Sequence, residues 1–487
     1  MTVTDRSGTA TDGPTGPLAG DIAAALEPLI DRATTRRRRT LVSATVPVAW
    51  CDPVALFGAA RALDEEAAIW LQQETGFGLV AIGSAWTVEA TGFDRFRRVA
   101  STWSEIVVDA LVRAPAGVSG TGPLLLGGFG FGAESARSLT WSGFEAARLD
   151  LPSLLLTVTA GSTWLTASVV VDPDGGAADV TAAGSRQIAQ RWGALVAGAT
   201  QPVPLVPASA ELRIAGQVPE AREWQATVAR FAGAVGRGRL DKVVLARRVD
   251  LQADGPIDVP AAIRRLEAAA PESTIFAVGR GTRTFLGATP ELLVRSEGRE
   301  FHTVAMAGSI RRGADAEEDE RLARELLASE KDREEQAIVV EMLRETLTPV
   351  TDRLEIARRP SVVRLRHIQH LATEVRGRLR DPAGIVGLVE RLHPTPAVGG
   401  APRELALELI AEGEPLERGW YAGPLGWLDR RGDGEFVVAI RSGVVEGGTV
   451  SLFAGCGIVA DSDPEREWEE SLIKLRALAT ALGSLRP

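Results

Sequence analysis

The stretch from residue 423 to residue 482 decides the fold: GPLGWLDRRGDGEFVVAIRSGVVEGGTVSLFAGCGIVADSDPEREWEESLIKLRALATAL. It contains three runs that are typical of β-strands, at 423–428, 435–446 and 449–459. The last two runs are separated only by Gly447-Gly448, which predicts a tight β-hairpin. The pattern therefore predicts three consecutive strands that lead into whatever follows residue 459.

A two-residue hairpin loop fixes the register of the two strands that it joins. It places Glu446 opposite Thr449, and counting back along both strands places Arg441 opposite Ala454 and beside Gly455. A large cation is thus expected next to a residue without a side chain.

A helix follows at 464–482, with Asp463 as N-cap and Pro464 as its first residue. Its apolar stripe consists of Trp468, Leu472, Leu475 and Ala479. Glu467, Glu470 and Lys474 share a different face. Spacing alone favours a solvated, salt-bridged face over a binding site.

A second helical region runs from about 314 to 348. Ser329 and Asp332 resemble a capping box, which predicts a new helix starting near Glu330. Asp332 and Glu335 lie on one face of that helix. Exposure to solvent is again the simplest interpretation of the pattern.

Composition excludes several classes of protein. The 487 residues carry a net charge of −10 with both signs interspersed, which argues against a nucleic-acid-binding surface. Two distant cysteines and four scattered histidines form neither a disulfide framework nor a zinc pattern, so any metal should be hard and bound by carboxylates. Neither a leader sequence nor an apolar stretch of membrane-spanning length is visible. We expect a cytoplasmic protein that does not contact the membrane.

Residues 1–18 are rich in Gly, Pro, Thr and Asp and are predicted to be a disordered tail. The remainder, 19–487, divides at a Pro-rich connector, 201–210, into an N-terminal half (19–204) and a C-terminal half (205–487). Predicted strands do not alternate regularly with helices, which favours an α+β fold over a doubly wound sheet.

Five ordered parts of the chain carry a family resemblance. They are LDKVVLARRV (240–249); FLGATPELLVR (285–295); AMAGSIRRG (305–313) with SEKDREEQAIV (329–339); HLATEVRG (370–377) with LHPTPAVGGAPRE (392–404); and RGWYAGPLG (418–426) through to the C-terminus. Together they resemble the chorismate-utilising enzymes, which include isochorismate, salicylate, anthranilate and aminodeoxychorismate synthases. The resemblance is strong over 205–487 and weaker before it, through GPLLLGGFGFGAES (122–135).

The resemblance implies a single large α+β domain like that of anthranilate synthase component I. Two large, mostly antiparallel sheets pack together, helices lie outside them, and the active site occupies a cleft between them. The substrate would be chorismate and the cofactor Mg²⁺. We expect a monomer.

The resemblance also implies roles for individual residues. Glu335 and Glu470 would bind magnesium, with Glu467 and Asp332 nearby or bridging through water, and oxygen ligands suit that ion. The predicted substrate-binding residues are Gly308, Ser309, His370, Ala397, Tyr421, Arg441, Gly455 and Lys474. Arg441 and Lys474 would offset the two negative charges of chorismate.

Hydroxyl transfer requires a base that activates water and an acid that protonates the leaving group. By resemblance, Lys242 is the base and Glu291 the acid. Lys242 must then lose a proton near neutral pH while Glu291 keeps one. Outside this family, Lys242 would be interpreted as a solvated strand-end lysine and Glu291 as a turn carboxylate.

Two residues distinguish among family members. Lys242 resembles the members that use water, because ammonia-using members typically carry Gln there; no glutaminase-like segment is present and no glutaminase subunit is expected. Ala397 resembles isochorismate synthases, whereas salicylate synthases and aminating relatives usually carry Thr. Isochorismate synthase is thus favoured over salicylate synthase, which also eliminates pyruvate, and over a catalytically inactive binding relative.

Three positions depart from the usual family pattern without falling on a proposed catalytic residue. They are Ala246 in place of Ser, Met306 without the usual preceding Pro, and Gln336 in place of His. The pathway stays open, because isochorismate leads to menaquinone, to salicylate and to dihydroxybenzoate-type siderophores.

Overall fold

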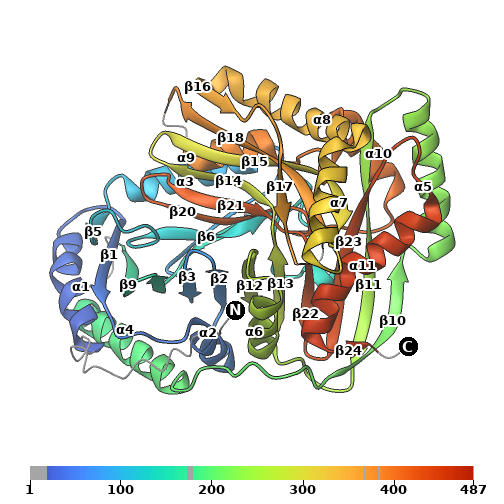
Figure 1. The fold of residues 1–487 in the computed structure, drawn as a ribbon. Helices are drawn as coiled ribbons and strands as arrows, with labels where there is room; N and C mark the ends of the chain where they lie inside the picture. The colour runs from blue at the N-terminus through green and yellow to red at the C-terminus, as the bar shows by residue number, and fades with distance from the viewer. Residues whose placement is uncertain (1–18, 173–178, 367, 382–383, 486–487) are drawn as a thin grey trace.

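The strands of the protein form two β-sheets (Figure 1). The computed structural model describes residues 19–172, 179–366, 368–381 and 384–485. In spatial order, the fourteen-stranded sheet consists of β24 (Ser484–Leu485), β10 (Glu211–Val218), β11 (Lys242–Ala253), β23 (Thr449–Ile458), β22 (Ser442–Glu446), β13 (Arg283–Thr289), β12 (Thr274–Arg280), β2 (Ala67–Gln72), β3 (Phe77–Ile82), β8 (Leu154–Thr159), β9 (Ser162–Val171), β1 (Thr40–Pro47) and β5 (Leu111–Arg113), with β19 (Gly400–Ala401) paired to β11.

The ten-stranded sheet is the second layer. Its order is β16 (Thr351–Ile356), β18 (Ile368–Leu379), β15 (Glu300–Arg311), β14 (Leu292–Glu297), β21 (Gly434–Val438), β20 (Pro424–Asp429), β6 (Leu124–Phe129), β7 (Ala147–Leu151) and β4 (Trp86–Ala90), with β17 (Ser361–Arg364) paired to β18. Of the strand pairs in the described residues, only β1–β5 and β10–β24 are parallel. The expected pair of mostly antiparallel sheets in one α+β domain is confirmed.

Helices lie outside the sheets (Figure 1). Those of the described residues are α1 (Ala19–Thr34), α2 (Pro53–Ala62), α3 (Arg95–Val107), α4 (Asp179–Gly198), α5 (Ala221–Gly236), α6 (Val259–Ala269), α7 (Ala316–Ala328), α8 (Glu330–Leu347), α9 (Gly384–Leu392), α10 (Arg403–Gly413) and α11 (Pro464–Leu482). The 3₁₀ turns are η1 (Leu139–Trp141) and η2 (Thr348–Val350).

Two hydrophobic cores hold these layers together. One contains side chains of both sheets, such as Phe285 and Phe453 from the larger sheet and Phe129 and Phe436 from the smaller. The other lies between the larger sheet and the helices α1, α2, α4, α6 and α11. Burial of this apolar surface is the main force that keeps sheets and helices packed.

The two halves of the chain are interleaved. Strands from 19–204 and from 205–487 contribute to both sheets, so the division at the connector stays a prediction. The connector at 201–210 contains neither helix nor strand, as expected. The predicted tail, 1–18, lies outside the described residues. Within the described residues, no helix is both long enough and apolar enough to cross a membrane.

The prediction of three consecutive strands in 423–459 is wrong in one respect. The run 435–446 is two strands, β21 and β22, which belong to different sheets. The chain leaves the smaller sheet after Val438 and joins the larger one at Ser442, so 439–441 is a sheet crossing. Continuous apolar character could not reveal this, because both strands are buried on both faces.

The hairpin register itself is confirmed. Glu446 pairs with Thr449, and the ladder continues back to Gly443 opposite Leu452. Arg441 lies before β22 and therefore outside this ladder, while Gly455 pairs with Ala246 of β11.

Both predicted helix starts are confirmed. Asp463 caps α11 by accepting hydrogen bonds from the backbone N–H groups of Glu465 and Arg466. Ser329 caps α8 by accepting from the N–H of Asp332 at 3.3 Å. Each cap satisfies amide groups that the helix leaves unpaired, so the start of each helix is fixed locally.

Candidate active site

Lys242 is the first residue of β11 and is buried. Its Nζ lies 2.6 Å from Oε1 of Glu335 on α8. Gly457 makes room for it, because a Cβ at 457 would lie 2.5 Å from Cε of Lys242. Burial alone would raise the pKa of Glu335, but the charge and hydrogen bond of Lys242, with the N–H of Gly308, outweigh burial and lower that pKa.

Glu291 lies between β13 and β14, where the chain passes from the larger sheet to the smaller. Burial raises the pKa of its carboxyl group to about 7, although Lys242, Arg441, Lys474 and the nearby hydroxyl group of Thr395 all act in the opposite direction. With a pKa near neutrality, this carboxyl group is protonated in part at neutral pH and can donate a proton, which is the property that the proposed acid requires.

Arg441 lies on the other sheet crossing and has a positive φ of 53°. Its guanidinium makes no hydrogen bond or ion pair with any residue that the structure describes, although Tyr421, Glu470 and Glu291 act on it electrostatically. Burial lowers the pKa of Arg441, but an arginine in this position stays charged. A half-buried cation without such a partner is suited to a carboxylate ligand.

Lys474 extends from α11 toward the same place. Its Nζ donates to the carbonyl of Gly455 at 2.9 Å and pairs with Glu470 at 2.6 Å. A Cβ at Gly455 would lie 3.1 Å from the hydroxyl oxygen of Tyr421, whose ring stacks on Phe453 at a centroid distance of 5.3 Å. Because Gly455 has no side chain, no atom of residue 455 beyond the backbone crowds the Tyr421 hydroxyl group.

Gly308 interrupts the β15–β18 ladder with a bulge and has a φ of +70°. A Cβ there would lie 2.9 Å from Cβ of Asp332, so the close approach of α8 requires glycine. Beyond the bulge, the Ser309 hydroxyl lies 2.7 Å from Nδ1 of His370, and the Ser309 N–H donates to Asp332 at 3.3 Å. Burial lowers the pKa of His370 to about 4, so this histidine is neutral at physiological pH.

The four proposed metal ligands lie on two helices. One oxygen each of Glu467 and Glu470 on α11 lies within 4.8 Å of the other and of Sγ of Cys456. Glu335 and Asp332 on α8 are not part of this group. Burial raises the pKa of Glu467, and burial raises that of the Cys456 thiol to about 12, which keeps the sulfur protonated. The available donors are therefore carboxylate oxygens, and they fit Mg²⁺ better than a thiolate-seeking metal.

Ala397 lies in a turn that precedes β19, the short strand paired to β11. The turn is closed by hydrogen bonds from the N–H groups of Val398 and Gly399 to the carbonyl of Thr395. Gly399 in turn accepts from Val244 of β11 at 2.9 Å. Ala397 is thus two residues from the threonine that contacts Glu291.

The three departures from the family pattern all occupy packed positions. Ala246 is buried and its N–H donates to Glu414 at 2.6 Å. Gln336 is buried and bonds to the Ala305 carbonyl and to Thr373, both at 2.9 Å. Met306 is partly buried.

Two residues of the site were not identified from the sequence. Gly457 accommodates Lys242, and Thr395 contacts Glu291. Both lie within segments that the resemblance had singled out, HPTPAVGG and GCGIV. The only available signal was therefore proximity to a motif, since neither residue type by itself indicates catalysis.

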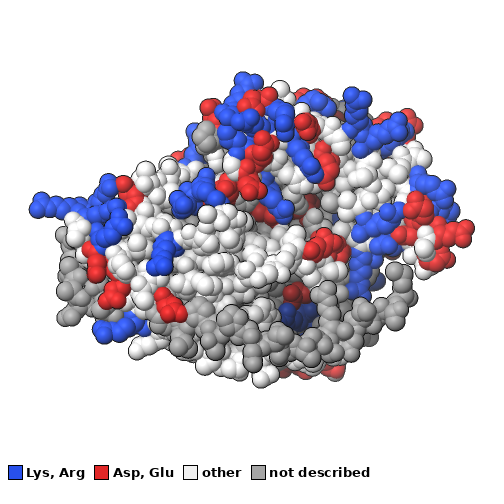
Figure 2. Space-filling view, turned by 60° about the vertical axis from the view of Figure 1, so that its left-hand side comes forward, with Lys and Arg blue, Asp and Glu red and all other residues white. Residues whose placement is uncertain are grey.

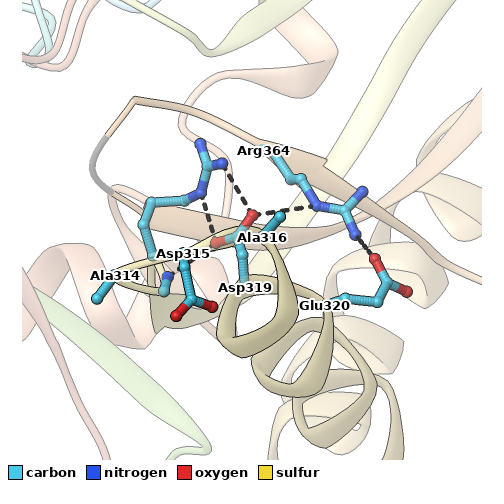
Figure 3. A pocket seen from close by; sticks show the side chains of 8 residues that line it. Ala314, Asp315, Ala316, Asp319, Glu320 and Arg364 are labelled. Atoms are coloured by element: carbon cyan, nitrogen blue, oxygen red, sulfur yellow. Dashed lines mark hydrogen bonds and ion pairs between the residues drawn. The ribbon is translucent and has the colours of Figure 1, made fainter.

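A separate hollow of about 490 Å³ lies where β15 leads into α7 (Figure 3). Its arginines are already paired: Arg312 holds Asp319 through two contacts of 2.8 Å, and Arg364 pairs with Glu320 at 2.6 Å. None of the predicted site residues lines it. On the face in Figure 2, acidic and basic side chains are interspersed over the upper part.

The chain resembles known proteins over nearly its whole length. Residues 28–483 match the family described as chorismate binding enzyme. A salicylate biosynthesis isochorismate synthase of Pseudomonas aeruginosa is 38% identical over 461 residues, covering 94% of each chain. The isochorismate synthase MenF of Bacillus subtilis is 35% identical over 463 residues, covering 94% of this chain and 96% of that protein.

A solved structure is similar over nearly its whole length. The menaquinone-specific isochorismate synthase MenF of Escherichia coli superposes with a TM-score of 0.76 at 27% identity, covering 94% of this chain and 99% of that one. Family match, near-complete coverage and shared fold lead to one conclusion: this chain belongs to the family of chorismate-binding enzymes.

Proposed function

We propose that the protein is an isochorismate synthase, which converts chorismate to isochorismate by adding water at C2 and releasing the C4 hydroxyl group. The observation that carries the proposal is that a candidate base, Lys242, and a candidate acid, Glu291, lie close enough in one site to affect each other electrostatically. Lys242 would act as the base after it gives up the proton that it shares with Glu335 in their ion pair, and Glu291, with a pKa raised to about 7, would act as the acid. Two relatives that match nearly the whole chain are named isochorismate synthases.

The other residues of the site would bind the substrate dianion. Arg441, which has no ion-pair partner among the described residues, and Lys474 supply positive charge for the carboxylates. Lys242 would take a proton from the incoming water at C2, and Glu291 would give one to the departing oxygen at C4. Ser309 and the neutral His370 can supply hydrogen bonds to the ring hydroxyl group.

Magnesium is the cofactor that we propose, held by Glu470 and Glu335 with Glu467 and Asp332 beside them. When bound, it would offset the negative charge of the substrate carboxylate among these acidic residues. The pairing of Glu335 with Lys242 and of Glu470 with Lys474 shows that both carboxylates already attract cations.

The test is to incubate the purified protein with chorismate and Mg²⁺ and to separate the products by chromatography. We expect isochorismate, formed reversibly and only with the metal. Accumulation of salicylate and pyruvate would indicate a salicylate synthase. The absence of any product would indicate a catalytically inactive relative. We also predict a monomer, a cytoplasmic location and independence from a glutaminase subunit. The same assay with the protein alone tests the independence from a glutaminase.

A further inference from the structure

The two sheet crossings lie side by side. One, at 290–291, carries Glu291 from the larger sheet to the smaller; the other, at 439–441, carries Arg441 back again. The Val438 N–H donates to the Glu291 carbonyl at 3.0 Å, and the Ala288 N–H donates to the Arg441 carbonyl at 3.3 Å. The proposed acid and the proposed substrate-binding cation are therefore held on two adjoining segments.

Regular strand pairing stops between these segments. The β13–β22 ladder ends at Gly287 opposite Ser442, and the β14–β21 ladder begins at Leu292 opposite Val437. In the gap, the hydroxyl group of Thr289 replaces ladder hydrogen bonds. It accepts from the Glu291 N–H at 3.2 Å and donates to the Val438 carbonyl at 2.7 Å.

This hydroxyl closes a ring of hydrogen bonds around one peptide segment. Val438 donates to Glu291, Glu291 donates to Thr289, and Thr289 donates back to Val438. Thr289 is 1% exposed, so water does not compete for these bonds. The N–H and the carbonyl group of Glu291 are thus both held, which fixes the position and direction from which its side chain starts.

The turn that carries Glu291 is not closely packed on every side, so packing alone does not do what this ring of hydrogen bonds does. A hollow of about 170 Å³ is lined by Thr289, Pro290 and Leu292, which flank Glu291 in the sequence. Because part of the turn borders open space, hydrogen bonds contribute more than close packing to holding the backbone of this turn in place.

We propose that Thr289 is a positioning residue that holds the Glu291 carboxyl group in the site and in register with Arg441. The proposal rests on the proposed function for the role of Glu291. Thr289 would contact neither substrate nor metal and would act through the backbone of Glu291 alone.

The charged groups that face Glu291 come from three elements: Lys242 of β11, Arg441 of the second crossing and Lys474 of α11. The hydroxyl of Thr395 faces it from the turn that precedes β19. Burial outweighs all four and raises the pKa of the carboxyl group to about 7. If the tether is lost, the carboxyl group can move toward solvent, and its titration midpoint should fall toward the ordinary value of 4.5.

The experiment compares Thr289→Val, which removes the hydroxyl at similar volume, with Thr289→Ser, which retains it. Thr303→Val is the matched control, because Thr303 is 2% exposed and its hydroxyl also donates to a backbone carbonyl, that of Leu293, at 2.7 Å. Both valine variants should lower the melting temperature. Only Thr289→Val should lower kcat, by about tenfold or more, with a smaller change in KM.

A second readout does not depend on activity. Carbon-13 NMR of glutamate-labelled protein follows the Glu291 carboxyl group, assigned by its absence in Glu291→Gln. We expect the midpoint to fall by about one pH unit in Thr289→Val and to stay at the parent value in Thr289→Ser and Thr303→Val. Should Thr289→Val not fold, Thr289→Cys offers a much weaker hydrogen-bonding group at nearly the size of serine.

Two outcomes overturn the inference: a Glu291 midpoint in Thr289→Val equal to that of Thr303→Val, or equal turnover in those two variants. Absence of isochorismate from the parent enzyme would instead refute the proposed function. The NMR comparison would still decide whether Thr289 positions Glu291.

Discussion

Lys242 and Glu335 form an ion pair, with 2.6 Å between Nζ and Oε1, that joins the first residue of β11 to the second turn of α8. The proposed base and a proposed metal ligand are thus direct neighbours. The contact joins residues that are 93 positions apart in the chain.

Replacing either proposed proton-transfer residue should slow turnover without abolishing binding. For Lys242→Ala and Glu291→Gln we expect turnover to fall by about 10² or more, because each change removes one proton-transfer group. Calorimetry should still detect chorismate. Lys331→Ala is the control, since that lysine is exposed and pairs with Asp461 at the surface. Near-normal turnover in either variant would remove that residue from the mechanism.

The pH dependence should follow the Glu291 carboxyl group. Its pKa is raised from 4.5 to about 7, so it is protonated below neutrality and loses the proton as pH rises. Because the acid must be protonated, kcat/KM should decline above about pH 7. The same raised pKa means that its contribution to stability, present below pH 4.5, is lost as pH rises through about 7. Glu291→Gln should therefore melt at a temperature that changes less over this range; parallel melting curves would argue against the raised pKa.

The concentration of Mg²⁺ that the enzyme requires should depend on carboxylates from both α8 and α11. For Glu335→Gln and Glu470→Gln we expect higher half-saturating concentrations of Mg²⁺, because each change removes a charged oxygen ligand. Glu341→Gln serves as the control, as Glu341 is exposed on α8 and pairs with Arg344 on the same helix. Titration of activity against Mg²⁺ measures the effect. Unchanged half-saturation in both variants would leave these residues as surface carboxylates.

The space beside Lys242 can be tested directly. In Gly457→Ala, the added Cβ would lie 2.5 Å from Cε of Lys242, so the lysine must move, and turnover should fall by about tenfold or more. Gly161→Ala is the control, because no atom lies within 4 Å of a Cβ at that position. Steady-state kinetics and thermal melting of both variants separate displacement of Lys242 from general loss of stability. Parent-like turnover in Gly457→Ala would show that the position of Lys242 is not critical.

Ala397 is expected to determine where the reaction stops. Pyruvate elimination from isochorismate depends on holding the enolpyruvyl group over the ring. The small methyl group of Ala397 leaves that group free to rotate away, whereas Ala397→Thr would restrict it and should increase pyruvate release. If Ala397 only packs the turn, the variant would merely lose about 1–3 kcal/mol of stability. A coupled lactate dehydrogenase assay decides, and a folded variant without additional pyruvate would refute the idea.

Several features of the fold could be predicted from short stretches of sequence. The helix starts at Glu330 and Pro464 and the Glu446–Thr449 register were predicted because each depends on residues within a few positions. The division of 435–446 between two sheets was missed, because a run of buried strand residues carries no mark of the sheet to which it belongs.

For the candidate site, the sequence by itself determined which residues carry reactive groups, through five ordered motifs that resemble one family. Only the tertiary structure decided which of them meet. Lys242 pairs with Glu335, Glu467 lies beside Glu470, and Arg441 is placed by a sheet crossing rather than by its hairpin register. The physical reason is that capping and turn formation act over a few bonds, whereas the raised pKa of Glu291 depends on burial and charge contributed by several distant segments.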